Sequence, residues 1–175
     1  RESSRTMTAT ATTQRPLPVP DTLSTPFWAA ARDHALHMQR CDSCGRMAYP
    51  PEIACRACGG DHLHFAPVSG RATLHSWTVL HEAPAPGFRD RLPLVLAVVE
   101  LEEQPGLLMS TNLVDADPAA LRVGMPLRAW FENVTDQCAL VQFRPAGRWS
   151  MWAHRNKVAV AGVGNSKLGR RSGRT

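Results

Sequence analysis

Two short stretches decide the fold of this chain: Cys41-Asp-Ser-Cys44-Gly45 and, after ten intervening residues, Cys55-Arg-Ala-Cys58-Gly59. Two cysteines separated by two residues can bind one metal ion from a single tight turn. The glycine that follows permits a positive φ, which lets backbone N–H groups point at the sulfurs. Four thiolates close a tetrahedral site with no open position, so the sequence predicts one structural zinc ion in a short rubredoxin-like ribbon.

Two alternatives to zinc remain at this stage, two disulfides or a set of buried thiols. The glycines after both pairs favour metal, and paired Cys-x-x-Cys motifs in a reducing compartment are more often ligands than disulfides. His62 and His64 lie near the second pair and could substitute as ligands. With four cysteines present they are not needed, and we interpret them as surface or strand histidines.

The composition is that of a globular protein of 175 residues, with 14 prolines that favour short strands and loops. The longest apolar run, residues 92–99, contains Pro93 and is far shorter than the roughly 20 residues that span a membrane. Residues 1–25 contain no apolar stretch typical of a secretory signal, so a cytoplasmic location is the expectation. Met7 is a plausible start of the natural protein.

The net charge of +5 is unevenly distributed. Residues 26–145 carry ten arginines, no lysine and thirteen acidic residues, whereas residues 146–175 carry seven basic residues and no acid. The predicted folded part is therefore mildly acidic, and the basic character belongs to the C-terminal tail.

The N-terminal part is predicted to be a disordered or loosely draped arm over residues 1–25, rich in Thr, Ser and Pro. Thr25-Pro26 is typical of an N-cap followed by proline at the first helical position, so a short helix is expected within residues 26–35. Phe27 and Trp28 are adjacent and cannot both face one narrow stripe. We interpret them as candidates for contact with a partner, against the alternative that both rest on this domain.

The next segments predict a ribbon followed by a barrel. Residues 36–41 alternate as a strand that leads into the first cysteine pair, and a second strand follows the other pair, so the ribbon covers residues 36–68. Five strand-like segments with turn signals between them then make up residues 69–145; they are 71–81, 94–101, 107–114, 126–134 and 137–143. A capped helical turn at 117–121, between the third and fourth strands, completes the layout of an OB-fold barrel. The predicted fold is mainly β.

Three side chains on the barrel strands were considered as functional groups. Cys138 lies on an alternating strand on which Ala139 and Val141 face the other way, and we interpret it as a small, partly buried thiol. His75 and His81 are predicted to share one side of the first barrel strand with Trp77. They are either lining residues of the barrel mouth or exposed strand histidines.

Several stretches together resemble one known family. They include Pro26-Phe-Trp28, residues 36–41, both cysteine pairs, Tyr49-Pro-Pro51, Ser69-Gly70, His75-Ser-Trp77, the loop 83–88 and residues 121–126. In this order they resemble proteins that join a rubredoxin-like zinc ribbon to an OB-fold, long catalogued as a domain of unknown function and linked to acyl-CoA metabolism. The resemblance covers residues 26–145. The chain departs from the family pattern at Glu52 and Arg56, which are not metal ligands.

The resemblance implies an accessory or scaffold subunit and no catalytic activity. Members of the family associate with thiolase-superfamily proteins, including lipid-transfer-protein-like aldolases and thiolases, and with hotdog-fold enoyl-CoA hydratases. They have been proposed to bind or hand over acyl-CoA, in fatty-acid or steroid breakdown. Arg89 and Arg91, in the proline-rich loop after the first barrel strand, are then the candidates for contact with the CoA phosphates, unless they are merely solvated.

The tail carries a second resemblance. Residues 157–171 resemble the first strand and loop at the amino end of thiolase-like lipid-transfer proteins, without a catalytic cysteine, as a fusion or read-through remnant would. The alternative is a basic tail with one β-prone run. A nucleotide-binding interpretation of Gly162-Val-Gly164 is weaker, because Gly169 is misplaced and too little chain follows for a βαβ unit.

Other function classes have less support in the sequence. No metalloprotease, nucleophile-elbow or Walker motif is present, which argues against an enzyme. Nucleic-acid binding is the main alternative because zinc ribbons and OB-folds both serve it, but it needs a basic groove with aromatic platforms, and residues 26–145 are net acidic. A metal or redox sensor needs labile thiolates, which a closed four-thiolate site disfavours.

Overall fold

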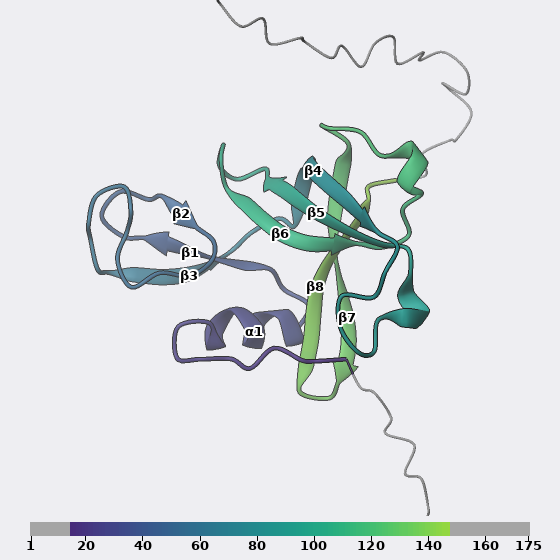
Figure 1. The fold of residues 1–175 in the computed structure, drawn as a ribbon. Helices are drawn as coiled ribbons and strands as arrows, with labels where there is room; N and C mark the ends of the chain where they lie inside the picture. Colours follow the sequence, from purple (N-terminus) through teal and green to yellow (C-terminus); the bar gives the residue numbers. More distant parts are fainter. Residues whose placement is uncertain (1–14, 148–175) are drawn as a thin grey trace, which may run out of the picture.

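A computed structural model gives the fold for residues 15–147 (Figure 1). The described chain contains one helix, α1 (Thr25–Arg32), and three ribbon strands, β1 (His37–Cys41), β2 (Met47–Ala48) and β3 (Leu63–Pro67). Five barrel strands follow: β4 (Arg71–Leu80), β5 (Leu94–Leu101), β6 (Leu108–Leu113), β7 (Pro126–Thr135) and β8 (Cys138–Pro145). Single 3-10 turns, η1 (Arg89–Arg91) and η2 (Pro118–Ala120), lie in the loops before β5 and β7. None of the helices in residues 15–147 is long and apolar enough to cross a membrane.

Helix α1 begins one residue earlier than the sequence indicated. Its N-cap is Ser24, whose side chain makes no capping bond, and Thr25 is the first helical residue. The predicted Thr25 cap is wrong because Asp21 organises the preceding turn: its Oδ1 accepts from the Ser24 N–H at 2.7 Å, and its carbonyl accepts from the Thr25 hydroxyl at 2.5 Å. The helix ends before His34, whose φ of 58° is left-handed.

The ribbon is a three-stranded antiparallel sheet in the order β2-β1-β3. Its central strand, β1, is buried on both faces. Met38 is 1% exposed, and the next residue, the polar Gln39, which points to the opposite face, is 4% exposed. The Gln39 amide donates to the Glu52 carbonyl and accepts from the Glu52 N–H, both at 2.8 Å. Strand β2 was not predicted, since two residues are too few to show a pattern.

The barrel is closed, with the strand order β4-β5-β6-β8-β7. Neighbouring strands are antiparallel except for β6 and β8, which meet in parallel at Leu113 and Phe143. Five strands with a helical turn between the third and fourth give the OB-fold predicted from the sequence, and Asp117 caps that turn by accepting from the Ala119 N–H at 3.0 Å. The fold-class prediction is confirmed.

A β-bulge corrects one side-chain assignment on β4. The register against β5 shifts between Leu74 and Ser76, so the alternation changes phase at His75. Trp77 and Val79 therefore pack against the core, whereas His75 is exposed. The prediction that His75 shares a side with Trp77 is wrong, because His75 is itself the extra, unpaired residue of the bulge.

One apolar core joins the barrel, α1 and the inner end of the ribbon. The barrel interior is centred on Phe143, which is 0% exposed, and it continues into Phe27 of α1 and Met38 of β1. Figure 1 shows α1 lying beside the lower part of β8 and below the ribbon, with the ribbon extending to one side of the barrel. On β8 the core side chains are Ala139, Val141 and Phe143, and Cys138 is half-buried, in agreement with the predicted alternation.

Candidate metal centre and ligand surfaces

The two cysteine turns at the far end of the ribbon have the same backbone geometry. In each turn the glycine has a positive φ, 73° at Gly45 and 76° at Gly59. Each glycine N–H donates to the carbonyl of the first cysteine of its pair at 2.8 Å. The N–H of that first cysteine donates in turn to the residue after the glycine, Arg46 in one turn and Gly60 in the other. A side chain at either glycine would be strained, so the sequence signal has a direct physical cause.

The four sulfurs form one cluster. Ligand atoms of Cys41, Cys44, Cys55 and Cys58 all lie within 4.8 Å of one another, and the pairs Cys41–Cys58 and Cys44–Cys55 are 3.6 Å apart. Zinc–sulfur bonds of about 2.3 Å in a tetrahedron place sulfurs about 3.8 Å apart, whereas a disulfide needs about 2 Å. The residues therefore fit one tetrahedral metal ion and exclude the disulfide alternative.

Backbone amides prepare these sulfurs to bind a cation. Hydrogen bonds from the N–H groups of Cys58 and Ala57 lower the pKa of Cys55 to about 7. The corresponding amides of the first turn, chiefly that of Cys44, lower the pKa of Cys41. Thiolates are the form that binds zinc, so these amides favour the ligand form at Cys41 and Cys55. At Cys58, by contrast, the pull of the Gly60 amide is outweighed by the neighbouring sulfurs, which raise the pKa.

The nearby histidines do not join the cluster. His64 Nδ1 lies 2.5 Å from Asp42, and His62 Nε2 lies 3.7 Å from Asp61. Both imidazoles are more than half exposed. Within residues 15–147 the sulfur cluster comprises the four cysteines alone.

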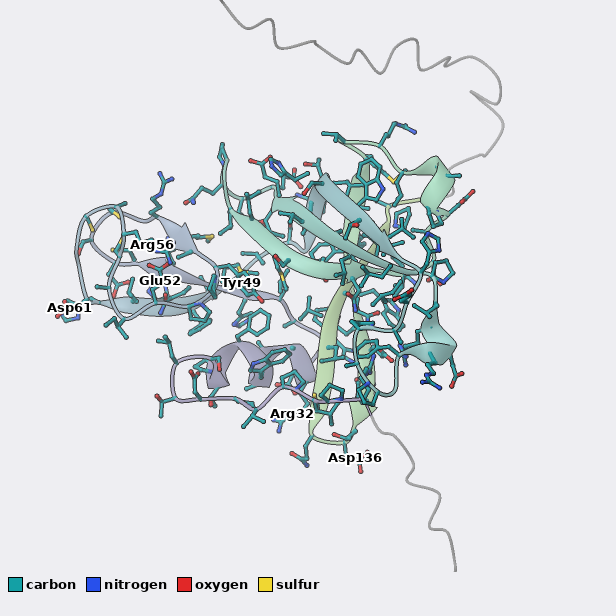
Figure 2. The ribbon with its side chains drawn as sticks, in the orientation of Figure 1. Arg32, Tyr49, Glu52, Arg56, Asp61 and Asp136 are labelled. Carbon is teal, nitrogen blue, oxygen red and sulfur yellow. The ribbon has the colours of Figure 1, made fainter. Side chains whose placement is uncertain are left out.

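A seam of contacts fixes the ribbon to the rest of the molecule. The Gln104 amide, from the loop between β5 and β6, accepts from the Met47 N–H at 2.9 Å and donates to the Met47 carbonyl at 3.1 Å. Tyr49 packs against Phe27, with ring centroids 5.5 Å apart, and burial raises its pKa. Figure 2 shows Tyr49 at the end of the ribbon nearest the barrel. The metal-bearing end is thereby held in one orientation.

The two departures from the family pattern contact each other. Arg56 Nε lies 2.5 Å from Glu52 Oε1, and Figure 2 shows both side chains on the ribbon. This ion pair was not predicted from the sequence. A spacing of four residues was the signal that could have indicated it.

The adjacent aromatic residues of α1 have different surroundings. Phe27 is 3% exposed and belongs to the core, so its ring offers almost no surface to another molecule. Trp28 is only partly buried and meets Phe27 edge to face, with centroids 5.1 Å apart. Both rings therefore rest on the core of this domain, as the alternative had it, and the partner contact stays a prediction that concerns the exposed part of Trp28.

The two loop arginines do not converge on one point. Arg91 Nη2 donates to Glu132 Oε1 at 2.6 Å, whereas Arg89 makes no ion pair within the described residues and lines a shallow hollow of the loop over residues 83–90. Of the two, Arg89 is the one available to an added phosphate.

A partly buried ion network around Glu132 was not predicted. The Glu132 carboxylate accepts from Arg91, from Arg15 at 3.1 Å and from Gln142 at 2.7 Å. Burial acts to raise the pKa of Glu132, but the hydrogen bonds and charges of the two arginines outweigh it, so the pKa is lowered. Arg15 lies 117 residues from Glu132 in a segment without periodicity, so no sequence signal indicated this pairing.

The fold and the sulfur cluster define a class: a zinc-ribbon protein whose ribbon is joined to an OB-fold. Two family profiles match in the same order, "ChsH2, rubredoxin-like zinc ribbon domain" over residues 28–64 and "ChsH2, C-terminal OB-fold domain" over residues 66–132. The chain belongs to this family of ChsH2-type, DUF35 proteins. Its ribbon is a rubredoxin-like zinc ribbon in which four cysteines cluster to hold one metal ion, as the sequence predicted.

Individual relatives agree with this assignment. A DUF35 domain-containing scaffold protein of Methanothermobacter thermautotrophicus is 32% identical over 99 residues, which is 56% of this chain and 72% of the relative. The 3-oxo-4,17-pregnadiene-20-carboxyl-CoA hydratase alpha subunit of Mycobacterium tuberculosis is 36% identical over 110 residues, 63% of this chain and 34% of that subunit. The chain spans only about a third of the hydratase alpha subunits that it matches.

Among solved structures, a chain of "Ltp2-ChsH2(DUF35) aldolase" is similar in both fold and sequence. It superposes with a TM-score of 0.67 at 32% identity, covering 74% of this chain and 99% of that chain.

Proposed function

We propose that this protein is a non-catalytic scaffold subunit that associates with a thiolase-superfamily enzyme of the lipid-transfer-protein type. The observation that carries the proposal is the similarity to a chain of "Ltp2-ChsH2(DUF35) aldolase", 99% of which is covered by 74% of this chain. The relative named as a scaffold protein supports the same role. A hotdog-fold enoyl-CoA hydratase is the second partner class, supported by the relatives named as hydratase alpha subunits.

The chemistry of the described residues agrees with a scaffold. The metal cluster has four sulfur ligands and therefore leaves no open position for substrate or water. Cys138 is half-buried, and no base is hydrogen-bonded to its thiol among the described contacts. These features favour a structural role over catalysis.

We place the partner surface around α1 and the seam between ribbon and barrel. Trp28 is its anchor, because a partly exposed tryptophan beside a rigid aromatic core is typical of an interface hot spot. Co-purification from the native host should recover an acyl-CoA enzyme in stoichiometric amount. Trp28→Ala should reduce that recovery at least about tenfold, equivalent to about 1.4 kcal/mol, while the exposed-residue control Val123→Ala leaves it unchanged. Recovery of the chain alone would contradict the proposal.

Acyl-CoA is the proposed ligand of the assembly, in lipid or steroid degradation. The steroid reading is supported by the relative whose name carries a pregnadiene carboxyl-CoA. Arg89, without an ion pair among the described residues, is the leading contact for a CoA phosphate, and Arg91 is secondary because Glu132 already binds it. Titration of CoA into wild type and the Arg89→Ala, Arg91→Ala double variant tests the site. Equal affinity, or no binding by either, removes the assignment.

Nucleic-acid binding is the alternative that the charge distribution disfavours. The acidic character of residues 26–145 repels a phosphate backbone. A tight, salt-insensitive complex of the protein with an oligonucleotide would reverse this ranking.

A further inference from the structure

A small pocket on the outer wall of the barrel has no ligand assigned to it above, although Arg91, the secondary candidate for contact with a CoA phosphate, is one of its lining residues. Its volume is about 210 Å³, and it lies where β5, β6 and β8 pass beneath the N-terminal arm and the loop that contains η1. Its polar lining comes from Arg15, Arg91, Asn112, Asp115 and Gln142. Gln142 points out of the barrel, because the side chains on either side of it in β8 belong to the core.

The pocket contains a buried acceptor with no donor. Gln142 is 2% exposed, its Nε2 donates to Glu132 at 2.7 Å, and its Oε1 is the one buried side-chain polar atom of the described residues that has no hydrogen-bond partner. Buried polar atoms are almost always paired, and an unpaired one costs about 1–3 kcal/mol. Reversing the amide would place its oxygen against the Glu132 carboxylate, so the orphaned atom is the oxygen in the favourable orientation.

Two residues with further hydrogen-bond donors, Arg15 and Arg91, line the same pocket. Arg15 and Arg91 each use one hydrogen bond on Glu132, and a guanidinium has five N–H donors. The two positive charges of these arginines are matched by Glu132, which pairs with both, and by exposed Asp115, which lines the pocket. The lining thus offers one acceptor and several donors with no net charge, which suits a neutral polar group.

We propose that this pocket binds a secondary amide of a small ligand. The ligand N–H donates to Gln142 Oε1, and its carbonyl oxygen accepts from Arg15 or Arg91. An amide is neutral and carries one donor and one acceptor, as the lining requires. A single water molecule occupies about 30 Å³ of liquid, so the pocket has room for more than one water.

The source of the amide is a separate question. A pantetheine arm carries two secondary amides, and assigning it as the ligand rests on the acyl-CoA part of the proposed function. A peptide carries the same group. Pantetheine and N-acetylglycine N-methylamide are therefore the two probes, and glycerol, which has hydroxyls but no amide, is the control probe.

Nuclear magnetic resonance of the full chain gives the test, observed at the Gln142 side-chain amide and the backbone amides of Asn112 and Leu113. At millimolar probe concentration we expect shifts with pantetheine and none with glycerol. Gln142→Met should weaken binding about tenfold, the loss of roughly one hydrogen bond. The control Gln137→Met, an exposed glutamine before the same strand, should bind as wild type.

The outcomes separate the claims. Shifts with N-acetylglycine N-methylamide and none with pantetheine would support the amide site and assign its ligand to a peptide. Shifts with neither probe, equal shifts with glycerol, or a crystal structure at millimolar pantetheine with only waters on Gln142 would overturn the proposal. The wild-type side-chain signal decides the matter even if Gln142→Met does not fold. Failure of the co-purification experiment would remove the scaffold function and leave the amide test unaffected.

Discussion

The ribbon and the barrel are stabilised in different ways. Five residues between 36 and 68 are buried, and two of them are metal-binding cysteines and one is a glutamine; they are Leu36, Met38, Gln39, Cys41 and Cys55. The barrel is filled by a continuous set of apolar side chains and closed by backbone pairing on every strand. Of these five, Leu36 and Met38 belong to that core, and the partly buried Met47, Tyr49 and Phe65 of the ribbon pack against it.

The ribbon therefore owes its stability and its orientation to separate parts of the molecule. The outer half of the ribbon has no apolar core, so metal binding must supply its folding free energy. The barrel and α1 fold on hydrophobic burial and present the seam against which the ribbon is positioned. The metal centre therefore has a structural role, because it keeps the ribbon folded. We expect a partner to recognise the surface that the folded ribbon helps to form.

Removing the metal should have the largest effect, because it should unfold the ribbon and leave the barrel folded. Zinc binding contributes on the order of 10 kcal/mol to small zinc modules, so a strong chelator or Cys55→Ser should unfold the ribbon from about residue 40 to residue 64. Amide signals of the barrel should persist, and zinc content measured by mass spectrometry should fall to zero. Cys138→Ser, outside the cluster, is the matched control and should retain full zinc. Ribbon signals that survive in chelator would show that the metal is dispensable.

Truncating a side chain of the barrel core should destabilise the barrel without removing the metal from the ribbon. Phe143 is fully buried where β6 meets β8, so Phe143→Ala should lower the free energy of unfolding by about 3–5 kcal/mol, as measured by denaturant titration. Val123, 69% exposed, gives the control Val123→Ala with a change near zero. Zinc binding should remain stoichiometric under native conditions. Loss of zinc from folded Phe143→Ala would mean that the two regions are not separable.

The metal-binding turns of the ribbon and most strands of the barrel could be predicted from the sequence, because the signals for both are local. The cysteine–glycine turns depend on backbone conformation within five residues, and the barrel strands depend on alternation within eight or ten, so both could be recognised without tertiary information. Strand β5 begins and ends where the pattern indicated, at Leu94 and Leu101.

The sequence could not predict contacts that depend on folding. The clamp between Gln104 and Met47 joins residues 57 apart, and the Glu132 network joins three separate segments. The bulge at His75 inverts an otherwise regular alternation, so that side-chain assignment was wrong. Residues 157–171, with the predicted thiolase-like resemblance, lie outside the described part of the chain, and that interpretation stays a prediction.

A smaller effect is expected at the seam between the regions. Gln104→Ala removes two hydrogen bonds to the Met47 backbone, each contributing about 0.5–1.5 kcal/mol. Hydrogen exchange at the Met47 amide should accelerate about tenfold, with little change in global stability. Gln137→Ala, on the exposed hairpin, should leave that exchange rate unchanged. An unaltered rate in Gln104→Ala would show that the clamp does not orient the ribbon.

The smallest effect concerns the pH dependence of the barrel. Because the pKa of Glu132 is lowered below 4.5 in the folded state, its ion pairs stabilise the protein above that pH, and their contribution is lost as the pH falls through the folded-state pKa. The contribution is about 1 kcal/mol or less, since the network is partly open to solvent. Thermal unfolding of wild type and Glu132→Gln should differ at pH 7 and converge near pH 3. A difference that grows in acid would contradict the assigned ion pairs.

The central claim is that the metal-stabilised ribbon and α1 together form a surface that binds a partner enzyme. Its most direct test is affinity purification of the full chain from its native host, with and without chelator, followed by native mass spectrometry. The account predicts a stoichiometric complex with a thiolase-superfamily enzyme that dissociates when zinc is removed. Recovery of the chain alone, or a complex unaffected by complete loss of zinc, would contradict it.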